Sequence, residues 1–230
     1  MAKEMAGPVI VSTDNQTQGR GQKGNSWESE PGKNLTFSLM WHPENFEACR
    51  QFSISEAIAI SVVDLLKEYG VEAKVKWPND IYVGDKKISG ILIEHSLSGR
   101  MIESTVAGVG LNINQLEFLS DAPNPVSLAQ IKSSTYDLDE LLSRFGVLAE
   151  SRIVALCDEE ERLRIHHEFL AKLWRGDGAY YPFRERSDGR KYYGRIIDVE
   201  PTGYLNVEER GGEIHKYAFK EVEFLLNDGF

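Results

Sequence analysis

The sequence has 230 residues, of which 41% are hydrophobic and 27% are charged, and its formal net charge is −10. This length and composition can bury one substantial core, or one core and a small second domain. The acidic balance argues against generic binding to nucleic acid or to an anionic membrane surface. The two cysteines, Cys49 and Cys157, lie far apart, which argues against a disulfide framework or a cysteine-rich zinc site.

The sequence gives no sign of a targeting or membrane-spanning segment. Its first residues, MAKEMAGPVIVS, lack the apolar run of a signal peptide. No uninterrupted apolar stretch approaches the length of a transmembrane helix. We therefore expect a cytoplasmic protein that does not bind membranes.

Two strands are expected near the start of the chain. A short apolar segment, Pro8–Ser12, predicts a buried strand that leads into a loop. In Asn34–Trp41 apolar and polar residues alternate, which predicts a strand with one buried face. The residues on that face are Leu35, Phe37, Leu39 and Trp41.

A helix is expected between residues 53 and 70. Ser53 and Glu56 have the spacing of a capping box, in which the two side chains satisfy backbone N–H groups of the first turn. Gly70 suits the position just past the helix end. The apolar residues between these limits recur at helical spacing and form one stripe.

Four strand-like segments follow, at 71–77, 81–83, 87–95 and 101–112. Tight turns separate the first three, and the turn Gly84-Asp85-Lys86 is typical of a hairpin. Residues 115–127 contain two prolines and show no periodicity, which predicts a loop.

The region 137–174 is helical in character, and we expect two helices that are broken near Cys157. The acidic run Asp158–Glu161 would form the exposed first turn of the second helix. His166 and His167 lie on this charged helix without the spacing of metal ligands, so we expect solvated histidines.

The sequence pattern changes after Gly178. Four short strand-like segments, at 180–183, 192–199, 204–209 and 214–219, are separated by turns that contain glycine. Short strands at this density predict a small β-barrel. We therefore expect one domain over residues 1–178 and a second over residues 179–230.

Gln16–Trp27 is a glycine-rich and locally basic loop in an acidic chain. Gly19, Gly21 and Gly24 leave backbone N–H groups free to face an anion, and Arg20 adds a planar donor that suits carboxylate or phosphate. The loop is neither a Walker P-loop nor a dinucleotide fingerprint, because it lacks GxxxxGK[ST] and opens no helix. From this motif alone, a solvated surface loop is an equal alternative.

A second candidate stretch is Lys76-Trp77-Pro78-Asn79-Asp80, with Lys87 on the segment expected to pair beside it. Asp80 follows a proline turn between strands, where a carboxylate could hold Mg²⁺ through water molecules. Two lysines and an aspartate beside a glycine loop suit a nucleotide. The alternative is a charged hairpin whose surface ion pairs contribute little.

These stretches resemble biotin–protein ligases. The family pattern G-R-G-x-x-G-x-x-W occurs at Gly19–Trp27. The family pattern K-W-P-N-D occurs at Lys76–Asp80. It is followed in the family by K-hydrophobic-small-G-hydrophobic-hydrophobic-hydrophobic-E, which occurs here at Lys87–Glu94. A third motif, G-hydrophobic-G-hydrophobic-N, occurs at Gly108–Asn112. The resemblance covers most of the chain and points to the short form, without an N-terminal DNA-binding domain.

The resemblance implies an α+β fold, with a mixed sheet and flanking helices of the class II synthetase-like type and a small SH3-like C-terminal domain. It also implies two chemical steps. In the first, the carboxylate of biotin attacks the α-phosphate of ATP, with Mg²⁺, to give biotinyl-5′-AMP and pyrophosphate. In the second, a lysine of a biotin carboxyl carrier protein attacks the mixed anhydride. Neither step needs a nucleophile from the enzyme, so catalysis would consist of positioning and charge stabilisation.

The resemblance further assigns roles to residues. Arg20 and Lys87 would be catalytic, at the junction of the biotin carboxylate and the α-phosphate. With these two, the biotin site would include Gln16, Gly21 and Gln22. With Arg20, the ATP and adenylate site would include Gly24, Trp27, Lys76, Asn79, Asp80 and Asn112. Asp80 would also be the ligand of Mg²⁺, and the loop 115–128 would order over the adenylate.

The sequence departs from the family in two places. Gln22 stands where the family usually has a second arginine, so the charge is lost and we expect weaker retention of the intermediate. The family carries a Ser-Thr-Asn motif well upstream of the glycine loop, whereas the similar Ser12–Asn15 directly precedes it. We therefore expect part of the biotin pocket to be missing.

Three alternatives are open. A lipoate–protein ligase shares the fold and the adenylation chemistry, but its arginine-led Gly-Gly-Gly stretch followed by histidine is absent. A biotin-sensing repressor would need a DNA-binding domain, for which the residues before 14 leave no room, so we expect no nucleic-acid partner. An inactive biotin-binding module is the third. A homodimer is compatible with the sequence.

Overall fold

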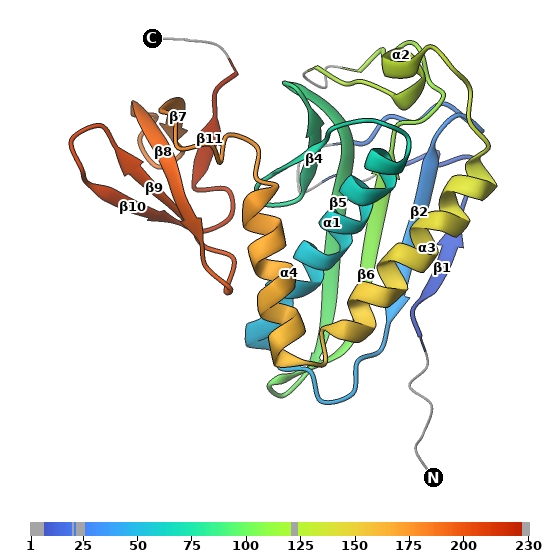
Figure 1. Cartoon of the computed structure of the whole chain (residues 1–230), viewed down its shortest axis with the longest axis horizontal. Coiled ribbons are helices and arrows are strands. Elements are labelled where there is room, and N and C mark those ends of the chain that lie inside the picture. The colour runs from blue at the N-terminus through green and yellow to red at the C-terminus, as the bar shows by residue number, and fades with distance from the viewer. Residues whose placement is uncertain (1–6, 20, 22–25, 121–123, 227–230) are drawn as a thin grey trace.

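The computed structural model describes residues 7–19, 21, 26–120 and 124–226, which form two antiparallel sheets (Figure 1). The first sheet has six strands in the order β1-β2-β6-β5-β4-β3. Among the described residues, parallel pairing is confined to isolated bridges, such as the one between Lys87 and Pro125. The strands of the first sheet are β1 (Val9–Ser12), β2 (Leu35–Trp41), β3 (Lys74–Lys76), β4 (Asp80–Val83), β5 (Lys86–Ser98) and β6 (Met101–Leu111).

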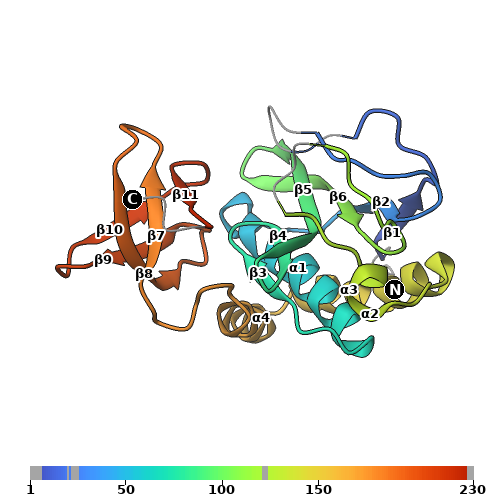
Figure 2. The same cartoon turned by 90° about the horizontal axis from the view of Figure 1, so that it is seen from above.

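Helices cover one face of this sheet and leave the other face open to the glycine loop. Figures 1 and 2 show α1, α3 and α4 side by side on the same face. The helices are α1 (Gln51–Glu68), α2 (Leu128–Lys132), α3 (Leu138–Ala155) and α4 (Glu159–Ala171). Within the part of the chain that the structure describes, no helix combines the length and apolar character needed to cross a bilayer.

The core lies between the helices and the first sheet. The expected apolar face of β2 is confirmed, because Leu35, Phe37, Leu39 and Trp41 are all buried. Each such side chain contributes about 1.5–3 kcal/mol when it is fully removed from water. The strand expected at Pro8–Ser12 is confirmed as β1, but its expected burial is wrong, because β1 is the edge strand of the sheet and Val9 and Val11 are largely exposed.

The start of α1 differs from the expected capping box. The helix begins at Gln51, directly after a short 3-10 helix at Ala48–Arg50. Ser53 therefore lies inside the first turn, where its Oγ donates a hydrogen bond to the Arg50 carbonyl at 2.8 Å. The far end is as expected: Gly70 has a φ of +69° just past the helix.

Glu56 and His166 form a buried pair between α1 and α4. The Glu56 side chain is 1% exposed, and its Oε1 lies 2.6 Å from Nδ1 of His166. The expectation of a solvated His166 is thus wrong, because the residue is 8% exposed and has a carboxylate partner. Burial raises the pKa of Glu56, although the hydrogen bond to His166 opposes this. The same hydrogen bond raises the pKa of His166.

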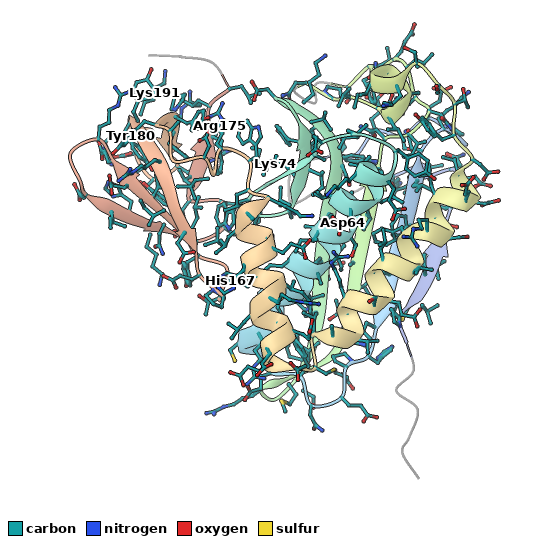
Figure 3. All side chains as sticks on the ribbon, in the orientation of Figure 1. Asp64, Lys74, His167, Arg175, Tyr180 and Lys191 are labelled. Atoms are coloured by element: carbon teal, nitrogen blue, oxygen red, sulfur yellow. The ribbon has the colours of Figure 1, made fainter. Side chains whose placement is uncertain are left out.

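The break between the last two helices is confirmed, since α3 ends at Ala155 and α4 begins at Glu159. The Asp158 carboxylate caps α4 by accepting a hydrogen bond from the Glu161 N–H, as the acidic run predicts. Figure 3 labels Asp64 on α1, and its carboxylate ties the three helices together. It contacts Arg152 of α3 and, at 2.5 Å, Lys172 at the end of α4.

The second sheet follows α4 and has five strands in the order β10-β9-β8-β7-β11. Its strands are β7 (Tyr181–Glu185), β8 (Lys191–Val199), β9 (Leu205–Glu209), β10 (Ile214–Tyr217) and β11 (Val222–Phe224). The expected small β-barrel is present as a sheet that does not close, because β10 and β11 are its edges and no pairing joins them within the described residues. The division of the chain after residue 178 stays a prediction.

The two sheets are joined through side chains of the lysine–tryptophan–proline motif. Trp77 is buried, and its indole Nε1 donates a hydrogen bond to the Gly203 carbonyl, 3.0 Å away in the turn between β8 and β9. Gly203 has a φ of +93°, and a Cβ there would lie 2.8 Å from the Phe52 ring. Arg175, labelled in Figure 3 where α4 leads into the second sheet, donates to the Leu225 carbonyl at 2.8 Å.

Candidate functional site

A cleft of about 1620 Å³ lies on the face of the first sheet that the helices do not cover. Its floor is made by β5 and β6, where Gly90, Leu92, Gly108 and Gly110 line it. The second sheet supplies one wall, which includes Arg184 of β7 and the residues of β11. Two sheets that are far apart in the sequence therefore enclose one site.

The three sequence motifs meet in this cleft. Its lining includes the predicted site residues Gln16, Gly21, Trp27, Lys76, Asn79, Asp80, Lys87 and Asn112. The other predicted residues, Arg20, Gln22 and Gly24, lie outside the described residues. Loop residues Phe118, Ser120 and Pro125 line the cleft as well, from the segment expected to cover an adenylate. The individual roles of these residues stay predictions.

The charged centre of the cleft is Asp80 between two lysines. Lys87 Nζ lies 2.6 Å from Asp80 Oδ1, and Lys76 Nζ lies 3.9 Å from Asp80 Oδ2. The three residues come together because β4 pairs with both β3 and β5, with a bulge between Ile81 and Tyr82. Burial lowers the pKa of Lys76, and the charge of Asp80 opposes that shift. This set offers two ammonium groups, held by one carboxylate, to an anion in the cleft.

The ring of Trp27 lies in a slot on the cleft floor. Gly90 and Gly110 face each other on β5 and β6, and neither has a side chain to fill the space above the strands. A Cβ on Gly110 would lie 2.3 Å from Trp27 Cε2, and one on Gly90 would lie 3.2 Å from the same ring. Lys87 Nζ is 5.6 Å from the centre of a Trp27 ring. A flat ring system can therefore rest on this glycine pair beside the lysine.

Replacing Gly110 by alanine should displace the Trp27 ring and reduce turnover while the protein stays folded. The added methyl group would overlap the ring, and misplacement of groups by about 1 Å can cost about 10²-fold in rate. Steady-state kinetics of the Gly110→Ala protein, with circular dichroism to check folding, measure the effect. Gly108→Ala is the matched control, because its Cβ would meet only the Leu92 carbonyl at 3.7 Å. Equal losses in the two variants would contradict the slot.

Two asparagines at the edge of the site have different surroundings. The Asn79 side chain donates a hydrogen bond to the Ile91 carbonyl, which fixes the turn before Asp80. Asn112 donates from Nδ2 to the Val126 carbonyl at 3.1 Å. Its Oδ1 is buried and accepts no hydrogen bond from any described residue. Asn112 thus keeps one buried acceptor without a partner among the described residues, beside the cleft that the residue lines.

Sequence reasoning missed the residues that come to the cleft from outside the motifs. Arg184 and Arg186 on and after β7 line it, and each pairs with Glu223 of β11, at 3.4 and 3.8 Å. Their positions depend on how the second sheet docks, for which the local sequence gives no signal. Glu28 was also missed, although it directly follows the glycine-loop motif.

Comparisons with known proteins agree on the family. Residues 2–112 match the biotin/lipoate A/B protein ligase family. Over 224 residues the chain is 30% identical to the bifunctional ligase/repressor BirA of Bacillus subtilis. This match covers 94% of this chain and 66% of that protein. It is also 30% identical, over 115 residues, to the biotin–[acetyl-CoA-carboxylase] ligase of Paracoccus denitrificans, covering 49% of this chain and 48% of that one.

A solved structure gives the same answer for the fold. The biotin protein ligase from Aquifex aeolicus, in complex with biotin and ATP, superposes with a TM-score of 0.75 at 25% identity. The match covers 93% of this chain and 87% of that one. The chain thus spans 66% of the length of the Bacillus relative and 87% of the Aquifex chain. The motifs, the cleft that unites them and these likenesses together show that the chain belongs to the biotin/lipoate A/B protein ligase family.

Proposed function

We propose that this chain is an ATP-dependent biotin–protein ligase. It would form biotinyl-5′-AMP from biotin and ATP and then transfer biotin to a lysine of a biotin carboxyl carrier protein. The observation that carries the proposal is the meeting of Lys87, Asp80 and Trp27 in one cleft, where the third motif also ends, at Asn112. We also propose that the protein acts in the cytoplasm.

In the first step, both reactants carry negative charge, so attack at phosphorus is opposed by repulsion. Lys87 would lie at the join between carboxylate and α-phosphate and offset that repulsion. The 2.6 Å contact with Asp80 supports this role, because it holds the ammonium group in the cleft before substrate arrives. Arg20 would contact the same junction, while Gln16, Gly21 and Gln22 would complete the biotin site.

In the same step, Lys76 and Asn79 would orient the triphosphate, and Asn112 with Gly24 would hold the adenylate. Trp27 would pack against the adenine from the glycine slot. The second step would need no proton donor on the anhydride, because AMP is a good leaving group and the carrier lysine is the nucleophile. The enzyme's contribution there is to keep the adenylate in place and exclude water.

Asp80 is the residue that would hold Mg²⁺. Asp80 Oδ1 lies 2.6 Å from Lys87 Nζ, whereas Asp80 Oδ2 lies 3.9 Å from Lys76 Nζ. Oδ2 is therefore the oxygen that could bind Mg²⁺, an ion that takes most of its other ligands from phosphate and water. A bound Mg²⁺ supplies charge neutralisation on the phosphates.

Exchange between ATP and labelled pyrophosphate tests the proposed function. We expect exchange that depends on biotin and is absent with lipoate, because the first step is reversible. Exchange with lipoate alone would identify a lipoate–protein ligase. Binding of biotin without any exchange would identify an inactive binding module, and either result would overturn the proposal.

Replacing Gln22 by arginine should slow the release of biotinyl-5′-AMP. The family usually has arginine there, and a hydrogen bond from a charged donor is worth about 1.5–3 kcal/mol, against about 0.5–1.5 kcal/mol for a neutral one. The off-rate of the adenylate from wild type and Gln22→Arg, measured by stopped-flow, checks this. Equal off-rates would refute weaker retention at Gln22, with Lys23 as the residue that could supply the charge instead.

A further inference from the structure

The described parts of the loop between β6 and α2, residues 112–120 and 124–127, contribute lining residues to the cleft and are held by hydrogen bonds at both ends. At its start, Gln115 accepts a hydrogen bond from Asn34 at 2.6 Å, and both side chains are buried. At its end, the Lys87 N–H donates to the Asn124 carbonyl and the Val126 N–H donates to the Lys87 carbonyl, each at 2.9 Å. The loop is therefore tied to the backbone of the residue that holds the charged centre.

The described middle of the loop has little apolar packing to hold it. Leu116 is 61% exposed and Leu119 is 88% exposed, so neither side chain anchors the segment. Phe118 and Ser120, by contrast, line the cleft. A segment with few buried contacts opens easily unless hydrogen bonds restrain it.

The Glu28 carboxylate supplies that restraint at Leu119 and Ser120, while Gln130 Nε2 donates to the Leu116 carbonyl at 2.7 Å. Glu28 Oε1 accepts from the Leu119 N–H at 2.9 Å and from Gln115 Nε2 at 3.2 Å. Glu28 Oε2 accepts from the Ser120 N–H at 2.7 Å. Burial favours a raised pKa for Glu28, but these hydrogen bonds outweigh it and leave the pKa lowered, so the group is charged at neutral pH. Charge-assisted hydrogen bonds are about twice as strong as neutral ones.

We propose that Glu28 is a positioning residue that latches the loop 115–120 across the cleft, next to the Trp27 ring that it directly follows. The latch joins the glycine-loop segment to the loop over the site, so each is held in place by the other before any ligand binds. The proposal rests on the proposed function in one respect: the enclosed ligand would be biotinyl-5′-AMP. Loss of the latch would let that intermediate escape to water before the carrier lysine attacks.

The experiment compares Glu28→Gln with Glu30→Gln in the full chain. Glu28→Gln keeps the size of the side chain but replaces one acceptor oxygen by a donor that faces a backbone N–H. Glu30 is an exposed neighbour in the same segment, so its variant controls for the loss of one charge. Amide hydrogen exchange of Leu119 and Ser120 is measured without ligand, and we expect it to rise by at least about tenfold in Glu28→Gln only.

The second readout is the lifetime of the bound adenylate. In Glu28→Gln we expect the off-rate of biotinyl-5′-AMP to rise about tenfold and the KM for ATP to rise more than kcat falls. Glu28→Asp, which keeps the carboxylate, should recover part of both effects. Unchanged hydrogen exchange in Glu28→Gln would overturn the latch. The hydrogen-exchange measurement uses no substrate. A wild-type protein without ligase activity would therefore contradict the proposed function and leave the test of the latch unaffected.

Discussion

Replacing Lys87 by alanine should nearly abolish formation of biotinyl-5′-AMP and leave the fold intact. The Lys87 ammonium group lies 2.6 Å from Asp80 in the cleft and 5.6 Å from the centre of a Trp27 ring, so it is in place before substrate binds. Loss of one preorganised donor at a developing charge typically costs about 10²–10³ in kcat. The side chain is partly exposed and contributes little to the core, so unfolding should change by less than about 1 kcal/mol.

Lys86→Ala is the matched control, because Lys86 is the adjacent residue on β5 and its side chain is exposed. Pyrophosphate release with biotin and ATP, measured together with urea unfolding, compares the two variants. We expect Lys86→Ala to match wild type. A folded Lys87→Ala protein that releases pyrophosphate at a near-normal rate would refute the assignment of Lys87 to the charged junction.

Replacing Glu56 by alanine should destabilise the protein by about 3–5 kcal/mol. The change removes the partner of a buried histidine and leaves a cavity between α1 and α4. Glu56→Gln keeps a hydrogen-bond acceptor at the same place, so it should cost distinctly less. Urea unfolding curves give the free energies. Glu150→Ala, on the exposed face of α3, should stay within about 0.5 kcal/mol of wild type.

The same pair predicts how stability changes with pH. The pKa of His166 is raised above its usual 6.5, so its contribution is fully present below pH 6.5 and is lost as the pH rises through the raised value. The raised pKa of Glu56 has a separate pH window, because its contribution is fully present below about pH 4.5 and is lost as the pH rises through its raised value. The difference in unfolding free energy between wild type and His166→Gln should therefore shrink between about pH 6 and pH 8. A difference that grows over this range would contradict the pairing.

Local patterns were enough to predict most of the first sheet, and the motif residues that they single out line one cleft. Alternation in β2 marks its buried face, and positive φ at Gly70 and Gly84 matches the predicted helix end and hairpin turn. The motif lysines and Asp80 converge because neighbouring antiparallel strands bring adjacent segments together, which the turns between them already indicate. These features depend on contacts between residues close in sequence.

Features that depend on distant contacts were not predictable. His166 looks like a surface residue among charged neighbours, and only the packing of α4 on α1 brings it to Glu56, 110 positions away. The edge position of β1 depends on which strands pair, not on its own apolar residues. Glu28 likewise gains its partners only when the loop after β6 folds back, 91 positions later.

The hydrogen bond from Trp77 to Gly203 limits how the two sheets can be separated or exchanged with those of relatives. Because a turn of the second sheet receives an indole from within the Lys76–Asp80 motif, the first sheet expressed alone would expose that ring and lose the fixed approach to Asp80. A chimera that imports the second sheet of a relative would need glycine at the position of Gly203, since any larger residue there strikes Phe52. The two sheets are thus one unit for protein engineering, and fusion points are better placed at the chain ends than between them.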